Sequence, residues 1–450
     1  MTRFAPPDAN AHPIWFVTPA TLQTILNTLG AAAAAHAGQL GFEGKAGQHA
    51  VLPATNGIVV LYGDEAGQGF APGKLVNLLP KGTYAFANEA FNSEAAALSW
   101  LLSSYRFATY KPQAEPPRLV APKGIKAAKI ERLAAAVVMG RDLINTPAND
   151  LGPDALDAAV ASLAKKHGAT FSAIRGDDLL AQNFPLIHAV GSAAAQPPRL
   201  VEFTFGPQDA PKVTLVGKGV TYDTGGLDIK PSSAMAIMKK DMGGAATALA
   251  LADMLMSAKA KIRLRVIIAI VENSISASSF RTGDIYKSRK GITVEIGNTD
   301  AEGRLILADA LTYADEEKPD LLLDFATLTG AARVALGPDL PPFYTQDDAL
   351  AGEIAAASLA AIDPVWRMPL WQPYAASLDG KISDMNNVAP GGFAGSIIAA
   401  LFLKRFVENH SWVHFDVYGW SPATKPGRPE GGEIQSARLL YDVILARYGV

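Results

Sequence analysis

Short apolar runs alternate with helical patterns over most of this chain. The runs at 212–216, 264–271 and 321–325 have the length of strands and are rich in Val, Ile and Leu, so they predict buried strands. The segments 244–256 and 397–406 carry apolar residues at helical spacing and predict helices. Strands that alternate with helices are typical of a mostly parallel or mixed sheet with helices on both faces. The pattern therefore predicts an α/β fold.

The first part of the chain shows the same alternation on a smaller scale. Residues 19–29 and 94–105 predict helices, and the alanine-rich run at 31–35 also favours a helix. Residues 51–53 and 58–62 predict short strands. These elements indicate a small α/β domain.

A proline-rich segment separates the two patterns. Four prolines lie between residues 112 and 122, which is typical of a linker. At 450 residues the chain also exceeds the size of one ordinary hydrophobic core. We therefore predict an N-terminal α/β domain over 1–120, ending in this linker, and a larger domain over 121–450.

Composition excludes several classes of protein. The chain has no cysteine, so disulfides cannot stabilise it, and its net charge of −3 gives no strong attraction to nucleic acid. No apolar run approaches the roughly 20 residues that cross a bilayer. The start MTRFAPPDANAHP lacks the charged and then apolar pattern of a signal peptide. These features predict a cytoplasmic protein that does not enter the membrane.

The most concentrated chemistry lies in the segment NTDAEGRL at 298–305. Asp300 and Glu302 stand two positions apart, so in an extended stretch their carboxylates point to one side and can hold cations. Arg304 would lie on that same side. A surface loop of mixed charge is the alternative for an isolated acidic segment.

A second group of charged residues punctuates the glycine-rich stretch at 216–246, where Lys218, Asp223, Lys230 and Asp241 occur. Together with Asp300 and Glu302 this makes four carboxylates, which cannot share a partly buried cleft unless cations or protons neutralise them. Two divalent metal ions would balance that charge. Oxygen ligands with one nitrogen suit Zn²⁺, Mn²⁺, Co²⁺ or Mg²⁺, and the sequence does not choose among them.

Three motifs, GKGVTYDTGGLDIKP, MKKDMGGAA and NTDAEGRLILADAL, together resemble the leucyl (cytosol) aminopeptidases. The resemblance extends through RDLINTPAND at 141–150, DFATLTGAA at 324–332 and WVHFDVYGW at 412–420. It implies a dimetal hydrolase that cleaves the first residue from short peptides with a hydroxide activated by the two metal ions.

The resemblance also implies which residues bind metal. Two ions, manganese or zinc before cobalt or magnesium, would be held by Lys218, Asp223, Asp241, Asp300 and Glu302. Asp223 and Glu302 would bridge the ions. Lys218 could coordinate only if its pKa fell well below about 10.4, because an ammonium has no lone pair. A solvated lysine at a strand end is the alternative for Lys218.

Lys230 and Arg304 resemble the family's two catalytic residues. By resemblance Lys230 stabilises the oxyanion of the tetrahedral intermediate, and Arg304 holds a bicarbonate ion that serves as the base. The alternative for Lys230 is an extended lysine before Pro231 that faces solvent. The alternative for Arg304 is a structural salt bridge to a neighbouring carboxylate, and the sequence does not separate the two roles.

The pocket for the substrate's first side chain would, by resemblance, be lined by Met238, Thr327 and Gly330. This favours an apolar side chain such as leucine, although Met238 is equally consistent with ordinary core packing. Tyr418 departs from the family, in which a small residue is commoner at this position. This departure bears on the pocket's specificity.

The seven histidines are not interpreted as zinc ligands. His410 and His414 have a helical interval, but 411–416 alternates like a strand, so the two should not share a helical face. We interpret the histidines as structural or surface residues. Asp416, in the same strand, is interpreted as a hydrogen-bonding core residue and not as a third metal ligand.

A DNA-binding regulator and a dimetal phosphoesterase are the alternatives to a peptidase. A DNA-binding regulator that retains the fold is the alternative, since some members of the family bind DNA, but the clearest basic stretch, 123–133, reads better as an amphipathic helix with Ile125, Ile130 and Leu133 inward. A dimetal phosphoesterase would use similar carboxylates, but the chain has no GxxxxGK[ST] motif. By resemblance the protein would form a homohexamer whose active sites face an interior cavity.

Overall fold

The computed structural model describes residues 3–54, 57–67 and 69–449. The chain divides into two compact units, Met1–Val138 with Ala423–Glu430, and Met139–Pro422 with Gly431–Val450. A short segment near the C terminus therefore belongs to the first unit. Helix α4 (Ala127–Asn145) contains the point at which the chain passes from the first unit to the second.

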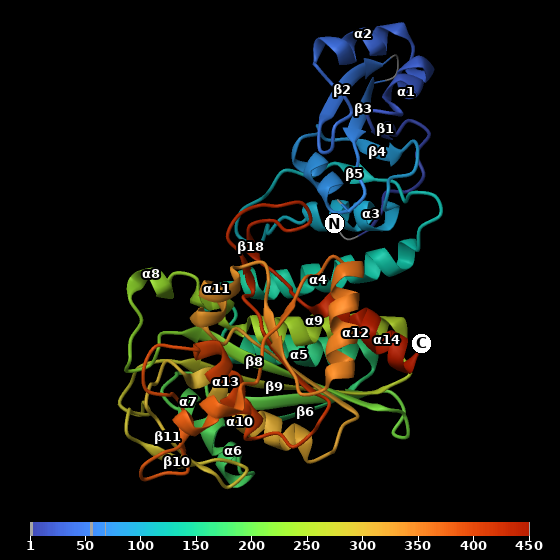
Figure 1. Ribbon diagram of the computed structural model, residues 1–450. Helices are drawn as coiled ribbons and strands as arrows, with labels where there is room; N and C mark the ends of the chain where they lie inside the picture. Colours follow the sequence, from blue (N-terminus) through green and yellow to red (C-terminus); the bar gives the residue numbers. More distant parts are fainter. Residues whose placement is uncertain (1–2, 55–56, 68, 450) are drawn as a thin grey trace. The chain divides into compact units, whose positions relative to one another are not determined.

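The first unit is built on a mixed sheet of five strands in the order β2-β3-β1-β4-β5. The strands are β1 (His12–Val17), β2 (His49–Ala54), β3 (Gly57–Gly63), β4 (Thr83–Phe86) and β5 (Arg118–Leu119). The helices are α1 (Leu22–Leu29), α2 (Ala31–Gln39), η1 (Ala71–Asn77) and α3 (Ser93–Ser103). The predicted small α/β domain is therefore observed (Figure 1).

Alternation along the strands divides this unit's core between the two faces of the sheet. Val17 and Leu61 pack with α1 and α2 on one face. Phe16 and Tyr62 point to the other face, where their rings meet at 6.0 Å. Helix α3 covers that second face through Trp100, whose ring lies 5.8 Å from that of Tyr84.

The proline-rich segment differs from the predicted linker, because part of it is a strand. β5 lies inside this segment and pairs with β4 at the sheet edge. The Pro117 carbonyl also accepts a hydrogen bond from Trp100 Nε1 at 3.2 Å. Proline is tolerated here because an edge strand needs ladder hydrogen bonds on one side only.

The second unit is built on a mixed sheet of eight strands in the order β14-β13-β16-β12-β8-β9-β7-β6. The strands are β6 (Thr170–Arg175), β7 (Arg199–Phe205), β8 (Lys212–Asp223), β9 (Arg263–Asn273), β12 (Leu321–Ala326), β13 (Pro342–Tyr344), β14 (Trp366–Arg367) and β16 (Trp412–Asp416). The four central strands β16, β12, β8 and β9 are parallel. Antiparallel pairing occurs toward both edges, as expected for a mixed sheet.

Helices cover both faces of this sheet (Figure 1). Helices α5 (Pro153–His167) and α9 (Gly243–Ala258) pack on one face, and α14 (Ala437–Tyr448) packs against α9. Helices α7 (Pro185–Gly191) and α10 (Glu302–Asp315) pack on the other, and α13 (Gly395–Lys404) packs against α10.

The remaining elements of this unit are short or lie at its periphery. They are α6 (Asp178–Ala181), α8 (Ser232–Met235), η2 (Met238–Met242), α11 (Gly330–Leu336), α12 (Asp348–Ala360), η3 (Gln372–Leu378), β10 (Ile285–Lys287), β11 (Thr293–Glu295), β15 (Met385–Asn386), β17 (Trp420–Ser421) and β18 (Gly431–Gly432). In the part of the chain that the structure describes, every helix is too short or too polar to cross a membrane.

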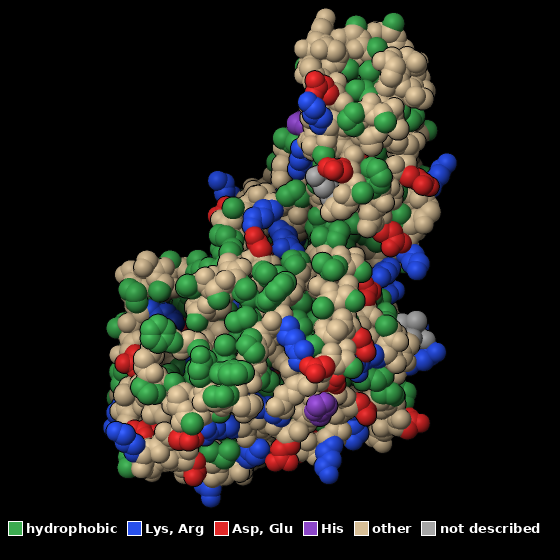
Figure 2. Space-filling view, viewed as in Figure 1, with side chains coloured by type: hydrophobic (Ala, Val, Ile, Leu, Met, Phe, Trp, Pro, Cys, Tyr) green, Lys and Arg blue, Asp and Glu red, His purple; other side chains and the backbone are tan. Residues whose placement is uncertain are grey.

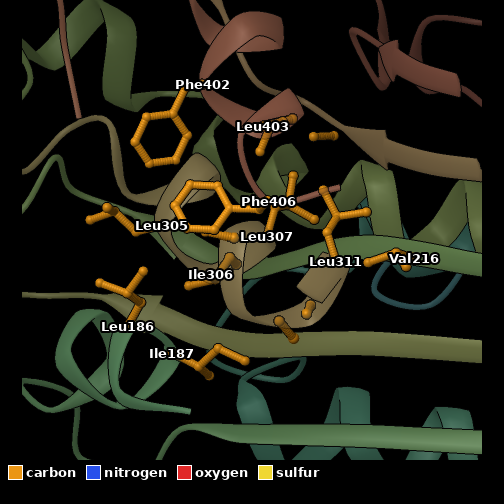
Figure 3. Packing of buried hydrophobic residues seen from close by; sticks show 14 of the residues in the cluster. Leu186, Ile187, Val216, Leu305, Ile306, Leu307, Leu311, Phe402, Leu403 and Phe406 are labelled. Carbon is orange, nitrogen blue, oxygen red and sulfur yellow. The ribbon is translucent and has the colours of Figure 1, made fainter. Parts of the chain in front are cut away.

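Helix α10 is fixed by a buried apolar cluster, shown in Figure 3. Leu305, Ile306 and Leu311 of this helix pack with Phe402 of α13 and Val216 of β8. Each of these side chains is at most 1% exposed. Burying such a side chain contributes roughly 1.5–3 kcal/mol, so this packing holds the start of α10 in place against the sheet.

The parallel strands carry polar residues at one common edge of the sheet. Strand β8 ends at Asp223, β9 at Asn273 and β16 at Asp416, and Thr327 directly follows β12. β8 is longer than the predicted 212–216, because it continues beside β9 to Asp223 with an irregularity between Val220 and Asp223. Ligands of parallel α/β sheets bind at the carboxyl ends of the strands, so this edge is the candidate site.

Candidate active site

Three carboxylates from distant parts of the chain meet at this edge. Asp223 lies at the end of β8. Asp300 lies in the turn that precedes α10, and Glu302 is the first residue of that helix. One oxygen atom of each lies within 4.8 Å of the others, a spacing that can hold a metal ion. They line a cavity of about 640 Å³ that also contains Lys218 and Lys230.

The backbone around Asp300 and Glu302 is not the extended stretch that the sequence predicted. The Asp300 amide donates to Asn298 Oδ1 at 2.7 Å, which forms a turn. Glu302 is then the first residue of α10. A carboxylate in the first helical turn is stabilised by the helix dipole, which the spacing argument ignored.

Gly225 and Gly303 leave the space that the backbone and the lysines of the site occupy. Gly225 has φ of +90°, and a Cβ there would lie 2.5 Å from the Asp228 carbonyl oxygen, so the turn between Asp223 and Lys230 requires glycine. A Cβ on Gly303 would lie 2.7 Å from Lys218 Nζ. Glycine at 303 therefore lets Lys218 reach the start of α10.

Lys218 and Lys230 lie among the carboxylates and do not face solvent. Lys218 Nζ is 2.8 Å from both Asp241 Oδ2 and Glu302 Oε1. Lys230 Nζ is 2.9 Å from Asp223 Oδ2 and also contacts Asp300. The solvent-facing alternatives for both lysines are therefore wrong.

Asp241 does not cap a helix. It lies in η2, and the N-cap position of α9 is Met242, which makes no side-chain cap. Instead Asp241 Oδ1 accepts a hydrogen bond from Thr327 Oγ1 at 2.8 Å. This contact orients the Asp241 carboxylate toward Lys218.

The cluster contains more negative than positive charge. Four carboxylates face two ammonium groups. Glu302 Oε1 forms an ion pair with Lys218, but neither oxygen of Glu302 accepts a hydrogen bond of regular geometry from a described residue. Burial, followed by the charge of Asp223, raises the pKa values of Asp300 and Glu302. Buried carboxylates with unused oxygen atoms are the donor set that a divalent cation would satisfy.

Electrostatics affect the two lysines in the opposite direction from burial. Burial would lower the pKa of Lys218, but the charges of Asp241 and Glu302 outweigh it and raise the pKa. The pKa of Lys230 is likewise raised, because Asp223 and Glu302 more than offset burial. Lys218 could coordinate a metal only after losing its proton, which requires the opposing field of nearby cations.

A shell of hydrogen bonds, which sequence reasoning missed, positions the acidic loop. Asn273 Nδ2 donates to Asp223 Oδ1 at 2.8 Å, and the Thr299 amide donates to Asp228 Oδ2 at 2.7 Å. Asn387 Nδ2 donates to the Asn298 carbonyl at 2.8 Å. Asp228 lies within the DTGGLDIKP motif. Asn387 is distant in sequence from the acidic loop, and no local pattern indicated its contact with Asn298.

Arg304 does not form the predicted alternative, a structural salt bridge. Its Nη1 donates to the Asn387 carbonyl at 2.7 Å, and no carboxylate among the described residues pairs with it. Its Nε is buried and has no hydrogen-bond partner in the described chain. Burial lowers the pKa of Arg304 to about 10. The guanidinium therefore retains a donor beside the cavity.

The three residues predicted to line a substrate pocket are brought together. Met238, Thr327 and Gly330 all line the same cavity as the carboxylates. A Cβ on Gly330 would have no atom within 4 Å, so the space beside it is open. Lys240 and Arg333 also line this cavity and add positive charge to it, and no sequence motif predicted a role for either.

Asp416 makes the hydrogen bonds of a structural residue. Its carboxylate accepts from Thr329 Oγ1 at 2.6 Å and from the amides of Leu328 and Thr329 at 3.1 and 3.2 Å. Arg333 also lies 3.3 Å from it. Asp416 thus fixes the segment after β12, consistent with the interpretation as a hydrogen-bonding core residue.

His414 is also structural. Its Nδ1 lies 2.6 Å from Asp324 Oδ1, and Asp324 Oδ2 accepts from Trp412 Nε1 at 2.8 Å. His414 and Asp324 are both 0% exposed. The helical ligand spacing of His410 and His414 is irrelevant, because β16 is a strand, as predicted.

The buried pair of His414 and Asp324 predicts that the free energy of unfolding depends on pH. Burial lowers the pKa of His414, but Asp324 outweighs it, so the folded pKa is raised above 6.5. The stabilisation is then complete below pH 6.5 and is lost as pH rises through the folded pKa. Urea unfolding of wild type and His414→Gln between about pH 6 and about pH 9 measures it. We expect the stability difference between wild type and variant to shrink as pH rises; a constant difference would contradict a protonated His414.

Comparison with family models identifies both parts of the chain. The model described as "Cytosol aminopeptidase family, catalytic domain" matches residues 138–441. The model described as "M17 aminopeptidase, N-terminal domain" matches residues 12–122. Together they account for most of the chain.

Individual proteins agree with these models. A probable cytosol aminopeptidase of Roseiflexus castenholzii is 38% identical over 365 residues, which cover 76% of this chain and 74% of the relative. The crystal structure of cytosol aminopeptidase from Coxiella burnetii is 41% identical, with a TM-score of 0.95 over 99% of both chains. The bottromycin maturation enzyme BotP in complex with Mn is 31% identical, with a TM-score of 0.88 over 98% of this chain and 100% of BotP.

Proposed function

The chain belongs to the cytosol aminopeptidase family of peptide hydrolases, and we propose that it releases the first residue of short peptides with two divalent cations. The observation that carries this proposal is the carboxylate cluster. Oxygen atoms of Asp223, Asp300 and Glu302 lie within 4.8 Å of one another, beside two lysines in one cavity.

The residues present suit such cations. We propose that Asp223, Asp241, Asp300, Glu302 and Lys218 hold them, because these side chains supply the excess negative charge, unused carboxylate oxygens and one nitrogen. Manganese or zinc is proposed first, in line with the Mn complex of BotP. When bound, the ions would polarise the peptide carbonyl and lower the pKa of a water molecule.

Lys230 is proposed to stabilise the oxyanion. Its side chain is only 13% exposed, and its raised pKa keeps the ammonium charged across the working pH range. Such a fixed charge stabilises negative charge as it develops on the carbonyl oxygen. Contacts with Asp223 and Asp300 hold the ammonium in position before the reaction, which reduces the cost of reorganisation.

Arg304 is proposed to bind bicarbonate. The support is its buried Nε, which has no partner among the described residues, and its guanidinium fork, which suits a planar anion. A base must come from such an anion or from water, because no histidine of the described chain lines the cavity. Bound bicarbonate would supply that base.

Selectivity for an amino terminus follows if the free amine of the substrate binds at the metal cluster. The first side chain would then lie toward Met238, Thr327 and Gly330. The apolar, leucine-like preference stays a prediction. The charged residues Lys240 and Arg333 line the same cavity as Met238.

Three further predictions remain open. A homohexamer would be measured by light scattering, and a cytoplasmic location stays a prediction of the sequence. DNA binding stays the alternative function, although Figure 2 shows basic side chains interspersed with acidic ones on the face it displays. Ile130 and Leu133 of the basic stretch are buried in α4, as the amphipathic interpretation predicted, whereas Ile125 lies before this helix and is only partly buried.

The proposal is tested with protein that has been stripped by a chelator. Mn²⁺, Zn²⁺, Co²⁺ and Mg²⁺ are then supplied singly, and hydrolysis of a panel of amino-acid p-nitroanilides is followed. Restored cleavage, with a metal-dependent rise in unfolding temperature, supports the two-metal aminopeptidase. Metal binding without cleavage of any amino-terminal substrate would overturn it and make DNA binding the next test.

A further inference from the structure

One cation in the cavity has no partner. Lys240, in η2, lines the cavity and is 6% exposed. The structure shows no hydrogen bond or ion pair from its ammonium to any described residue. Its Nζ lies over the ring of Tyr418, 4.8 Å from the ring centroid. Removing an ammonium from water without an acceptor is costly, so this group is suited to an anionic ligand.

Lys239, the residue before Lys240, has a hydrogen-bond partner and lies in different surroundings. Lys239 Nζ donates to the Asn145 carbonyl at 2.6 Å, and its side chain lines a separate cavity with Tyr222 and Glu272. The two neighbouring lysines therefore point into different cavities. Of these two neighbouring lysines, Lys240 is the one that lines the cavity with the carboxylate cluster.

Lys240, Arg333 and Tyr418 line the same cavity as the residues proposed to contact the first side chain. The Tyr418 ring is near both cations, since Arg333 Cζ lies 5.6 Å from its centroid. Arg333 is compensated by Asp416 at 3.3 Å, but Lys240 has no such carboxylate. Met238 provides apolar surface in the same cavity.

We propose that Lys240 binds the side-chain carboxylate of an acidic first residue, so that the enzyme prefers N-terminal glutamate or aspartate to leucine. The inference rests on the proposed aminopeptidase function and replaces its leucine-like preference. The aliphatic stem of glutamate would use the apolar surface of Met238, and the carboxylate would satisfy the buried ammonium. A charge-assisted hydrogen bond of this kind is stronger than a neutral one.

The discrimination should be large, because a polar group left unpaired penalises the wrong substrate. Leucine would bury Lys240 without an acceptor, whereas glutamate would pair it. A site built around a buried hydrogen-bonding group rejects an analogue that lacks the partner more strongly than an apolar pocket rejects a missing methylene. Glutamine separates charge from shape, since it has the length of glutamate but no negative charge.

The experiment compares kcat/KM for glutamate, glutamine and leucine p-nitroanilides in the manganese-loaded full chain. Wild type is expected to favour glutamate over both by at least about tenfold. Lys240→Met should lower the rate with glutamate and raise the rate with leucine, which reverses the order. Lys240→Arg should retain the preference for glutamate over glutamine. Lys239→Met, the matched control, should leave all ratios unchanged.

Folding is monitored separately. Because Lys240→Met removes a buried unpaired charge, its unfolding temperature is expected to equal or exceed that of wild type. Faster cleavage of leucine than of glutamate by wild type overturns the inference and leaves the aminopeptidase proposal intact. An equal change of the ratios in Lys239→Met also overturns it, while failure to cleave any substrate overturns both.

Discussion

Glu302→Gln is expected to lower kcat/KM for amino-terminal hydrolysis by at least about 10³-fold, because metal ions in such sites supply several kcal/mol of transition-state stabilisation. Glu302 is 1% exposed, and both of its oxygens lack hydrogen bonds from the described residues. Glutamine keeps the shape but removes a charge and one strong oxygen donor. The rise in unfolding temperature on adding Mn²⁺ should also disappear, which calorimetry measures without any substrate.

The matched control is Glu316→Gln at the other end of the same helix. Glu316 is 49% exposed and pairs with Arg289 at 2.7 Å, so its loss should change stability by less than about 1 kcal/mol. Its response to Mn²⁺ should equal that of wild type. If Glu302→Gln retained both the manganese response and the rate, Glu302 would not be a metal ligand.

Lys230→Met is expected to lower kcat by about 10² to 10³-fold while KM changes little, because the ammonium acts on the oxyanion of the transition state. Its effect on metal binding should be opposite to that of Glu302→Gln. Lys230 lies 2.9 Å from Asp223 Oδ2, so its removal makes the cluster more negative. Titration with Mn²⁺, followed by calorimetry, should therefore show binding at least as tight as in wild type.

Lys212→Met is the control for this variant. Lys212 lies at the opposite end of β8 from Asp223, and its Nζ donates to the Glu317 carbonyl at 3.1 Å in an exposed hydrogen bond. Its kinetics should match wild type. A raised KM with unchanged kcat in Lys230→Met would show that Lys230 binds the substrate in its ground state and does not stabilise the transition state.

The local sequence pattern predicted many elements of the second unit. Apolar runs such as 264–271 predicted buried strands, since a strand covered on both faces needs apolar residues at nearly every position. The acidic and lysine residues of the site were identified because their motifs are contiguous and resemble one family. Their roles as metal ligands and catalysts stay predictions.

Local geometry was less well predicted. Spacing alone suggested an extended Asp300–Glu302 segment, but the hydrogen bond from the Asp300 amide to Asn298 forms a turn, and packing of Leu305 and Ile306 fixes a helix from Glu302. The proline-rich segment looked like a linker, yet the edge of the sheet offered β5 a partner strand. The turn arises from a local side-chain hydrogen bond that spacing alone does not indicate. The start of α10 and the pairing of β5 depend on contacts with segments that are distant in sequence.

The sequence by itself determined the α/β class and the two-part organisation, because alternating apolar patterns are local properties. Contiguous motifs that resemble one family indicated the acidic and lysine residues that meet in the site. Only the tertiary structure decided which side chains remained without partners. Lys240 and Lys239 are adjacent and chemically identical, but one donates to the Asn145 carbonyl and the other lines the cavity beside Tyr418. Such differences arise from packing between distant segments, which sets burial and hydrogen bonding and therefore the chemistry available to each side chain.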